Sequence, residues 1–210
     1  MDKKMNDIKR TQVQRSSETQ TLLLEATIDC LIECGYMHTT TVEVVKRAGV
    51  SRGAQVHHYR NKMGLITAAT EYLFLEFIDE IEVLSIELKK SGGDVNNFLH
   101  ATLDKFFHGR FFFASLELIT ASRTDPDLTD RLIPLIKTLH QRLDDIWNRL
   151  YEVTETSPAR VETLLNMTLC LLRGMALQSV LRDDPEYYAE LLDTWKQILS
   201  SFLIRKEGIT

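Results

Sequence analysis

The sequence predicts an all-helical protein with about nine helices. Only four prolines and nine glycines occur among its 210 residues, and long stretches lack both. Sheets joined by many tight turns need more of these residues, so a sandwich or barrel is not expected. Apolar residues make up 44% of the chain, enough for a core, and they recur at helical spacing. No segment has a convincing strand pattern.

Four helices are expected in the first ninety residues, and each begins at a residue that can cap it. They are predicted at residues 17–34, 41–47, 52–59 and 62–90, with caps at Ser17, Thr40, Ser51 and Asn61. Ser17 and Gln20 form a capping box, in which the two side chains satisfy exposed backbone amides. Gly35 can end the first helix and Gly49 the second, because glycine adopts left-handed backbone angles readily.

The last two-thirds of the chain repeat one signal for a helix start. Asp125, Ser157 and Asp184 each precede a proline, and proline is favoured at the first position of a helix. The helices in this part are predicted at residues 94–108, 110–122, 126–154, 158–182 and 185–205. Pro134 falls inside one of them, so we expect it to kink that helix or to split off a short first piece.

Charge is distributed unevenly along the chain, although the net charge is only −5. Residues 1–62 hold ten Lys and Arg against seven Asp and Glu, whereas residues 63–210 hold fifteen against twenty-three. The resulting charges of +3 and −8 favour a first third that meets a polyanion, with chance scatter as the alternative. There is no membrane-spanning apolar run, no secretory leader and no disulfide framework, so we expect a cytoplasmic protein.

Residues 40–59 have the pattern of a helix-turn-helix, two short helices joined by a turn that contains glycine. Val45, Ala48 and Val50 are expected to pack inside, with Gly49 in the turn. The second helix would then enter the major groove of DNA, where its polar side chains would meet base edges or phosphates. Those side chains are Arg52, Gln55, His57 and His58.

From Leu23 to Leu65 the chain resembles the amino-terminal part of the TetR/AcrR family of bacterial transcriptional regulators. The resemblance rests on ECGY after the first helix, TTTV before the second, and AGVSRGA followed by HHYRNK. It implies a DNA-binding domain at residues 17–77 and a helical ligand-binding and dimerisation domain at residues 78–210. It also implies a homodimeric regulator that binds double-stranded DNA and responds to a small molecule.

The family pattern implies DNA-binding roles for individual positions. Thr40, Thr41 and Lys62 correspond to phosphate contacts, and Arg52 corresponds to a base contact. Four further residues lie on or beside the surface that would face the groove, namely Gly53, Gln55, His57 and His58.

Two positions of the second short helix depart from the family pattern. The family usually has an apolar residue followed by tyrosine where this chain has Gln55 and Val56. Either Val56 packs inside and Gln55 faces DNA, or the helix is slightly rotated. Tyr59 stands where the family usually has phenylalanine, and we expect it to pack inside.

Phenylalanines gather around Gly109 and suggest a ligand pocket, because ligand sites are mostly apolar. The candidate pocket residues are Phe106, Phe107, Phe111, Phe113, Leu116, Trp147, Met167 and Met175. An effector bound there would be apolar or aromatic. The alternative is that these side chains form ordinary core packing where two helices meet.

The last two helices carry apolar residues over more than one face, which is more than one bundle core requires. A symmetric four-helix dimer interface would bury the excess, and the family resemblance implies the same interface. The candidate interface residues are Leu165, Leu169, Leu172, Ala176, Leu192, Trp195 and Leu199. The alternative is a bundle that is fully intramolecular.

No catalytic motif occurs, so we expect neither an enzyme nor a cofactor. Cys30, Cys34 and His38 could be imagined as metal or redox ligands, but their spacing favours core packing, and Cys170 is interpreted in the same way. The function predicted is a repressor that a small molecule releases from a palindromic operator. The competing hypothesis is a helical-bundle enzyme or small-molecule carrier whose amino-terminal part does not bind DNA.

Overall fold

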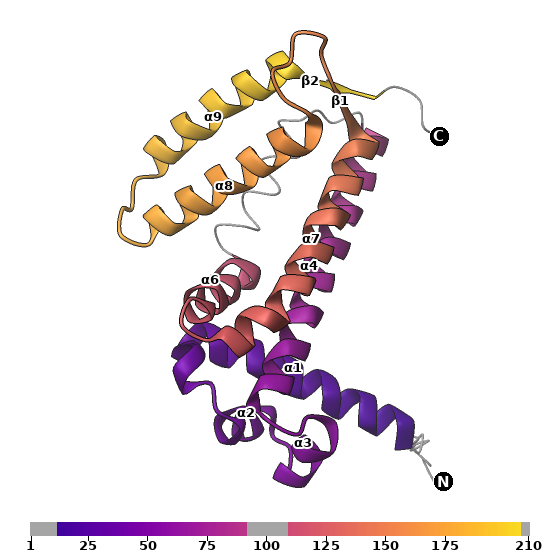
Figure 1. Cartoon of the computed structure of the whole chain (residues 1–210), viewed down its shortest axis with the longest axis vertical. Helices are drawn as coiled ribbons and strands as arrows, with labels where there is room; N and C mark the ends of the chain where they lie inside the picture. Colours follow the sequence, from indigo (N-terminus) through magenta and orange to yellow (C-terminus); the bar gives the residue numbers. More distant parts are fainter. Residues whose placement is uncertain (1–11, 92–108, 207–210) are drawn as a thin grey trace, which may run out of the picture. The chain divides into compact units, whose positions relative to one another are not determined.

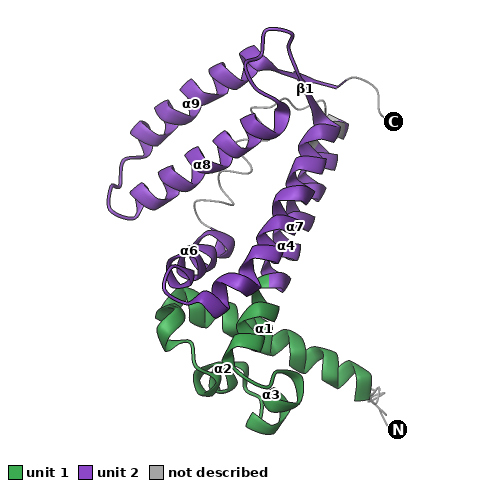
Figure 2. Cartoon of the chain, in the orientation of Figure 1, with its two compact units in different colours: residues 1–70 green, residues 71–210 purple. Residues whose placement is uncertain are grey.

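The computed structural model describes residues 12–91 and 109–206, which form eight α-helices and two short β-strands (Figure 1). The chain divides into two compact units, residues 1–70 and 71–210 (Figure 2). The division falls inside α4 (Lys62–Ser91), which therefore belongs to both units. Within the described ranges, no helix is long and apolar enough to span a membrane.

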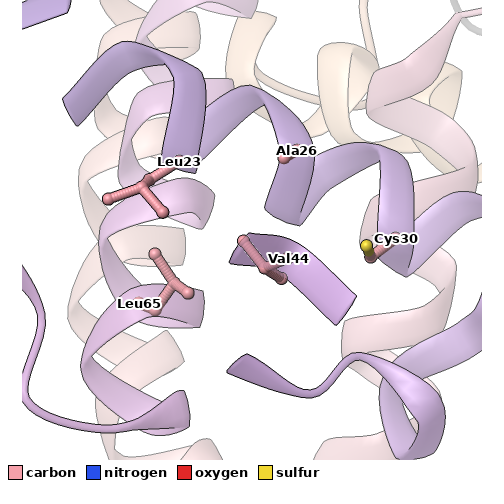
Figure 3. Close-up of a cluster of buried hydrophobic side chains, with 5 residues drawn as sticks. All are labelled: Leu23, Ala26, Cys30, Val44 and Leu65. Atoms are coloured by element: carbon pink, nitrogen blue, oxygen red, sulfur yellow. The ribbon is translucent and has the colours of Figure 1, made fainter. Parts of the chain in front are cut away.

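Unit 1 is a small helical domain built around aliphatic side chains. It contains the start of α4 and three complete helices, α1 (Gln12–His38), α2 (Thr41–Ala48) and α3 (Arg52–His58). Its core is formed by Leu23, Ala26, Cys30, Val44 and Leu65 (Figure 3). The partly buried residues that pack against this core are Val45, Ala48, Val50 and Tyr59. These four side chains were expected inside the helix-turn-helix, and that prediction is confirmed.

The ends of α2 and α3 are fixed by local hydrogen bonds at the predicted residues. The Thr40 hydroxyl accepts from the backbone N–H of Glu43 at 3.2 Å and so caps α2. Gly49 then adopts φ 65° and ψ 28°, the left-handed conformation that ends α2. The Ser51 hydroxyl accepts from the N–H of Ala54 at 3.1 Å and caps α3.

The first helix is longer than predicted at its amino end. It is already helical at Gln12, so Ser17 lies in its interior and the predicted capping box at Ser17 is wrong. The periodic apolar pattern starts only near Leu23 because the earlier turns of α1 are exposed. Gly35 interrupts the helix with φ 75° and ψ 167°, and one further turn runs to His38. The break predicted at Gly35 is confirmed.

Unit 2 consists of longer helices and includes most of α4. Its other elements are α6 (Arg110–Ser122), α7 (Pro126–Leu150), β1 (Tyr151–Val153), α8 (Val161–Ser179), α9 (Pro185–Phe202) and β2 (Leu203–Arg205). The helix predicted at 94–108 lies outside the described residues. In Figure 1, α7 runs alongside α4, and Arg149 donates to Glu82 between them at 2.8 Å. Helices α8 and α9 also run side by side, and the Trp195 indole donates to Thr168 at 3.0 Å.

The expectation of no strand is wrong at two places. Helices α7 and α9 end earlier than predicted, and the residues after each continue as short strands. These strands pair antiparallel, with Tyr151 opposite Arg205 and Val153 opposite Leu203. The pairing satisfies backbone groups that lie past the two helix ends. The partners are about fifty residues apart, so helical periodicity in either segment could not reveal it.

The prolines begin two helices as predicted, but not the third. Asp125 and Asp184 accept backbone hydrogen bonds at the starts of α7 and α9, at 3.0 and 3.1 Å. Ser157 does not cap α8, because its hydroxyl bonds locally to Ala159 and the helix begins only at Val161. Pro134 lies within α7, which continues through it, so the predicted splitting is not observed.

Candidate nucleic-acid interface

Helix α3 presents one continuous exposed face. Arg52, Gly53, Val56 and His57 are all exposed, and in a helix these positions lie side by side. We call these four residues the outer face of α3. The opposite side packs on unit 1 through Gln55, which is 2% exposed, and through partly buried neighbours. Because α2 and α3 are capped at both sides of the turn, the outer face has a fixed orientation within unit 1.

Gln55 is a core residue, so its prediction as a DNA contact is wrong. Its side-chain amide donates to the backbone carbonyl of Tyr59, which follows the last residue of α3. That carbonyl lies past the helix end, and the buried amide supplies its partner. Val56 is 50% exposed. The alternative in which Val56 packs inside and Gln55 faces DNA is therefore reversed in the structure. A signal existed in the sequence, since Gln55 is four residues before Tyr59 and must share its inward side.

Lys62 ties the start of α4 to the end of α1. Its ammonium donates to the carbonyl of Tyr36 at 2.6 Å and lies 4.3 Å from the centre of the Tyr36 ring. A longer contact of 3.5 Å reaches the carbonyl of Met37. Lysine near a helix C-terminus stabilises the last carbonyl groups. Lys62 therefore has a structural role in addition to the phosphate contact predicted for it.

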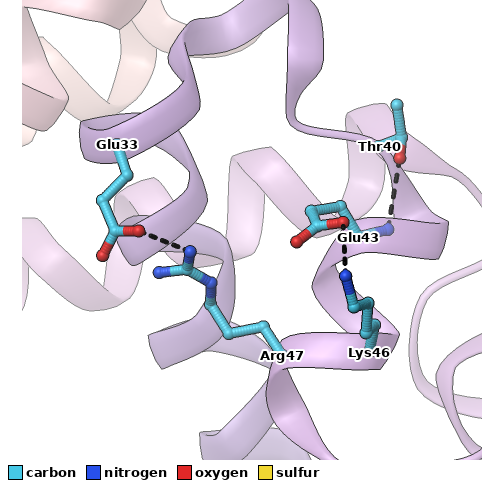
Figure 4. Close-up of polar contacts among 5 residues, drawn as sticks. All are labelled: Glu33, Thr40, Glu43, Lys46 and Arg47. Atoms are coloured by element: carbon cyan, nitrogen blue, oxygen red, sulfur yellow. Dashed lines mark hydrogen bonds and ion pairs between the residues drawn. The ribbon is translucent and has the colours of Figure 1, made fainter.

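The threonines predicted to contact phosphate lie at the start of α2. Thr40 is exposed and its hydroxyl oxygen already accepts the capping bond from Glu43, drawn in Figure 4. Thr41 is half-buried and is the first residue of α2. Each hydroxyl has one proton to donate, and an oxygen that accepts a capping bond keeps that proton. Both positions can therefore donate to an anion beside α2.

Arg47 is directed to an acidic partner within unit 1. Its guanidinium donates to the Glu33 carboxylate of α1 at 2.5 Å (Figure 4). This hydrogen bond holds the pKa of Glu33 below its ordinary value and raises the pKa of Arg47. Lys46, by contrast, is mostly exposed and lies 3.9 Å from Glu43. The pair of Arg47 and Glu33 joins α1 to α2 beside the helix-turn-helix.

The two cysteines of α1 do not form a ligand cluster. Cys30 is fully buried in the unit 1 core, and burial raises the pKa of its thiol. The core interpretation of Cys30 is therefore confirmed. Cys34 is half-buried, and its carbonyl contacts the imidazole of His38 at 3.2 Å. Cys170 is exposed on α8, so its interpretation as a core residue is wrong.

Unit 2 contains an apolar cavity of about 330 Å³ among α4, α6 and α7. We call it the α4–α6–α7 cavity. Its lining consists of Phe74, Ser115, Leu118, Ile119, Ser122, Thr129, Leu132, Ile133, Ile136 and Lys137. The hydroxyls of Ser115, Ser122 and Thr129 donate to backbone carbonyls, at 2.9, 2.9 and 2.6 Å. Contacts with the remaining surface of the cavity are therefore mainly apolar.

None of the described pocket residues lines this cavity, although Phe111 borders a separate, smaller cavity of about 100 Å³ together with Phe77. Phe111 stacks on Phe77 with ring centres 3.9 Å apart, and Trp147 and Met175 are each 2% exposed within the helical packing. Three more are scattered outside the cavity, with Leu116 half-buried and Phe113 and Met167 exposed. Phe106 and Phe107 lie outside the described residues. The aromatic cluster is core packing at its buried positions, which was the stated alternative.

The predicted dimer residues are mostly buried within a single chain. The buried ones are Leu165, Leu169, Leu172, Ala176, Leu192 and Leu199. They cannot contact a partner, because they already pack inside unit 2, and this part of the prediction is wrong. Trp195 is half-buried and bonds to Thr168. The exposed apolar residues of these helices are different ones, namely Met167, Leu177 and Ile198, followed by Val180 and Leu181 beyond α8.

Comparison with known proteins agrees with this geometry. The family model described as bacterial regulatory proteins, tetR family, matches residues 23–69. The chain is 29% identical to the HTH-type transcriptional regulator CymR of Pseudomonas putida over 194 residues, covering 92% of this chain and 95% of that protein. It is 31% identical to an uncharacterized HTH-type transcriptional regulator of Mycobacterium tuberculosis over 182 residues, which cover 83% of this chain and 92% of that protein.

A solved structure of a transcriptional regulator from Rhodococcus sp. Rha1 has the same fold. Its TM-score is 0.65 at 24% identity, with 87% of this chain and 97% of that chain covered. The fold and the helix-turn-helix thus define a DNA-binding transcriptional regulator rather than an enzyme. The chain belongs to the TetR family of bacterial regulatory proteins, whose members bind DNA and are usually dimers.

Proposed function

We propose that this regulator is a repressor that binds a palindromic operator as a homodimer and is released by a small effector. The observation that carries the proposal is the outer face of α3, which is exposed on a capped helix-turn-helix. A recognition helix of this kind enters one major groove, and its dimer mate enters a second. The half-sites would be centred about 10 base pairs apart, or a multiple of that spacing.

The exposed polar groups divide into base and phosphate contacts. Arg52 and His57 stand on the outer face of α3 and can reach base edges in the groove. Thr40, Thr41 and Lys62 lie at helix starts, where contacts with the sugar-phosphate backbone are expected. His58 is only half exposed, so its place is beside the groove. Phosphate contacts would supply affinity, and Arg52 with His57 would supply discrimination between sequences.

We assign the effector to the α4–α6–α7 cavity. Its volume of about 330 Å³ lies at the lower end of the range for small-molecule sites. Its hydroxyl groups donate to the protein backbone, which favours an apolar or aromatic effector. This assignment replaces the phenylalanine cluster as the candidate pocket.

Helix α4 is the proposed connection between effector and DNA. Leu65 near its start belongs to the unit 1 core, and Phe74 further along lines the cavity. Suppose that α4 has two placements and that only one allows DNA binding. An effector that binds the other placement more tightly would shift the population away from the DNA-binding state. The shift is limited by the difference between its affinities for the two states.

The exposed apolar residues of α8 support the dimer. Met167, Cys170 and Leu177 are exposed and Gly174 is half-buried; the four follow intervals of three and four residues, and the next position in this pattern is Leu181. This spacing forms one stripe along a helix, as at the seam of a helical bundle. A second copy of the chain would cover it. Leu177→Glu should raise the dimer dissociation constant at least about tenfold, because a carboxylate would be desolvated in the interface.

Sedimentation equilibrium tests the dimer, with Gln178→Glu as the control. Gln178 is the neighbouring exposed residue outside the stripe, so its substitution should leave the dimer intact. A Leu177→Glu protein that dimerises like the wild type would contradict this interface.

Selection of bound duplexes from a random library tests the operator. A palindrome is expected, bound at nanomolar concentration with a steep salt dependence of about −0.9 log units per phosphate contact. Weak binding that is equal for all duplexes would overturn the proposal. A reporter gene behind the selected operator then distinguishes repression, in which deletion of the regulator raises expression, from activation.

A further inference from the structure

We propose that Val56 is a specificity-determining residue, whose side chain contacts the methyl group of a thymine in each operator half-site. The inference rests on the proposed role of α3 as the recognition helix. It goes beyond that role because it assigns a particular base to Val56, which is not among the residues that the sequence pattern offers as DNA contacts. The side chain of Val56 has no hydrogen-bonding group, so it can contact a base only through apolar atoms.

Val56 is an exposed apolar residue at the middle of the outer face. Its side chain is 50% exposed, while the adjacent Gln55 occupies the inward position. Around the helix the four residues follow in the order Arg52, Val56, Gly53 and His57. Val56 therefore lies between Arg52 and Gly53. Val56 is not among the side chains that pack against the unit 1 core. It gives the centre of an otherwise polar face an apolar surface.

Gly53 lies beside Val56 and has no side chain that would project from the outer face. The fold does not require a glycine at this position. In the described residues, positive φ angles occur only at Gly35 and Gly49. A Cβ at position 53 would meet only the Ser51 hydroxyl at 3.8 Å, an ordinary contact. Glycine is less favourable than alanine within a helix. Its presence at an exposed position is accounted for if the backbone of α3 approaches a ligand closely, which a short side chain such as Val56 also needs.

The chemistry of the major groove identifies what Val56 contacts. Thymine alone presents a methyl group there, and small apolar side chains recognise it. Arg52 on the same face is suited to the paired acceptors of guanine. The two residues are separated by about 6 Å along the helix, and base pairs are about 3.4 Å apart. The half-site should therefore contain a thymine about two base pairs from the base that Arg52 contacts.

Removing single methyl groups from the operator tests this assignment. The full-length protein is titrated with its selected operator, in which each thymine in turn is replaced by deoxyuridine in both half-sites. At one position, loss of the methyl should weaken binding about fourfold per half-site, and about fifteenfold for the dimer. Binding that is insensitive to every such replacement would overturn the proposal.

Variants then connect that thymine to Val56. Val56→Ala should weaken binding to the thymine operator and should remove the sensitivity to deoxyuridine at that position. His57→Ala is the matched control, because it also alters the outer face but should keep the sensitivity. Val56→Ala that remains fully sensitive would place the methyl contact elsewhere and contradict the proposal. Gly53→Ala should raise the melting temperature while weakening operator binding several-fold, and unchanged binding would contradict close approach.

The same measurements separate this inference from the proposed role of α3. If Arg52→Ala leaves operator binding unchanged, α3 is not the recognition helix, and both proposals fail. If Arg52→Ala weakens binding while no thymine methyl matters, only the role of Val56 fails.

Discussion

Units 1 and 2 are both helical, but their helices differ in length and in the space that they leave. In unit 1, α2 and α3 have only eight and seven residues, and side-chain hydrogen bonds or a left-handed glycine fix their ends. In unit 2, the complete helices have 13 to 25 residues and leave a cavity of about 330 Å³. Hydrogen bonds at both ends hold the two short helices in place, whereas the longer helices leave this space among their side chains.

This difference suits the two proposed tasks. A surface that must match base edges needs a fixed helix, and α3 is fixed by Ser51 at its start and by Gln55 near its end. A region that must accept a small molecule needs unfilled volume. The contrast predicts that substitutions in unit 1 change stability or DNA recognition, while substitutions around the cavity change the effector response.

The largest effect is expected in the unit 1 core. Leu23→Ala removes a fully buried side chain from a core of few members, so the free energy of unfolding should fall by about 2–5 kcal/mol. Urea unfolding followed by circular dichroism measures it. Leu22→Ala is the matched control, because Leu22 is the next residue and is 49% exposed. Equal losses for the two variants would show that the unit 1 core is not tightly packed around Leu23.

The next largest effect concerns the division of work on the DNA-binding surface. Arg52→Ala should cost about 1–3 kcal/mol per half-site and relax preference at one base position. Lys62→Ala should weaken binding to all sequences alike and reduce the salt slope by about one for each protomer. Titrations with the operator and a scrambled duplex at several salt concentrations distinguish them. The division is wrong if both variants lose affinity in the same way.

Filling the cavity should affect unit 2 alone. Ile133→Trp places a large ring at the α4–α6–α7 cavity and should weaken effector binding at least about tenfold, or about 1.4 kcal/mol. Operator affinity without effector should remain near that of the wild type. Effectors are first found by screening small apolar and aromatic compounds for release of DNA. Val83→Trp, at an exposed α4 position that does not line this cavity, is the control. Full response in Ile133→Trp would place the effector elsewhere.

A smaller effect is expected from the cap of α3. Ser51→Ala removes the acceptor for the N–H of Ala54, which should cost about 1 kcal/mol of stability. Ser51→Asp should preserve the cap and serves as the control for stability. Thermal unfolding of the two variants measures the difference. Equal stability of Ser51→Ala and wild type would mean that the turn, rather than the cap, fixes the start of α3.

The smallest effect is expected from the ion pair on the surface of unit 1. The hydrogen bond from Arg47 holds the pKa of Glu33 below its ordinary value, so the pair stabilises the fold at neutral pH. Its contribution should be lost as the pH falls through the lowered pKa of Glu33. The difference in stability between wild type and Glu33→Gln should therefore be present at neutral pH and vanish in acid. A difference that persists in strong acid would contradict this origin.

The helix-turn-helix was predictable because its signals are local. Thr40, Gly49 and Ser51 determine helix ends through atoms within a few residues of themselves, and the same holds for Asp125 and Asp184. Such signals can be recognised in the sequence without knowing what packs against them. The same local pattern singled out the exposed basic residues Arg52 and His57. Their contacts with DNA remain proposals.

The α4–α6–α7 cavity and the exposed stripe of α8 depended on packing between distant segments. Periodicity marks Leu165 and Leu172 as apolar but does not say whether a helix of the same chain or a partner covers them. Likewise, Trp147 and Met175 are apolar enough for a pocket, yet the surrounding helices bury all but about 2% of each side chain. A cavity is the space that side chains from several helices leave empty, so no single helix encodes it.

The amino-acid sequence by itself determined the helical class, most helix starts and the helix-turn-helix, since these depend on neighbouring residues and short-range hydrogen bonds. Only the tertiary structure decided that β1 pairs with β2, which apolar residues of α8 are buried, and which helices surround the cavity. Each of these depends on which groups meet across the fold. Burial and pairing are properties of two surfaces in contact, and a linear pattern describes only one of them.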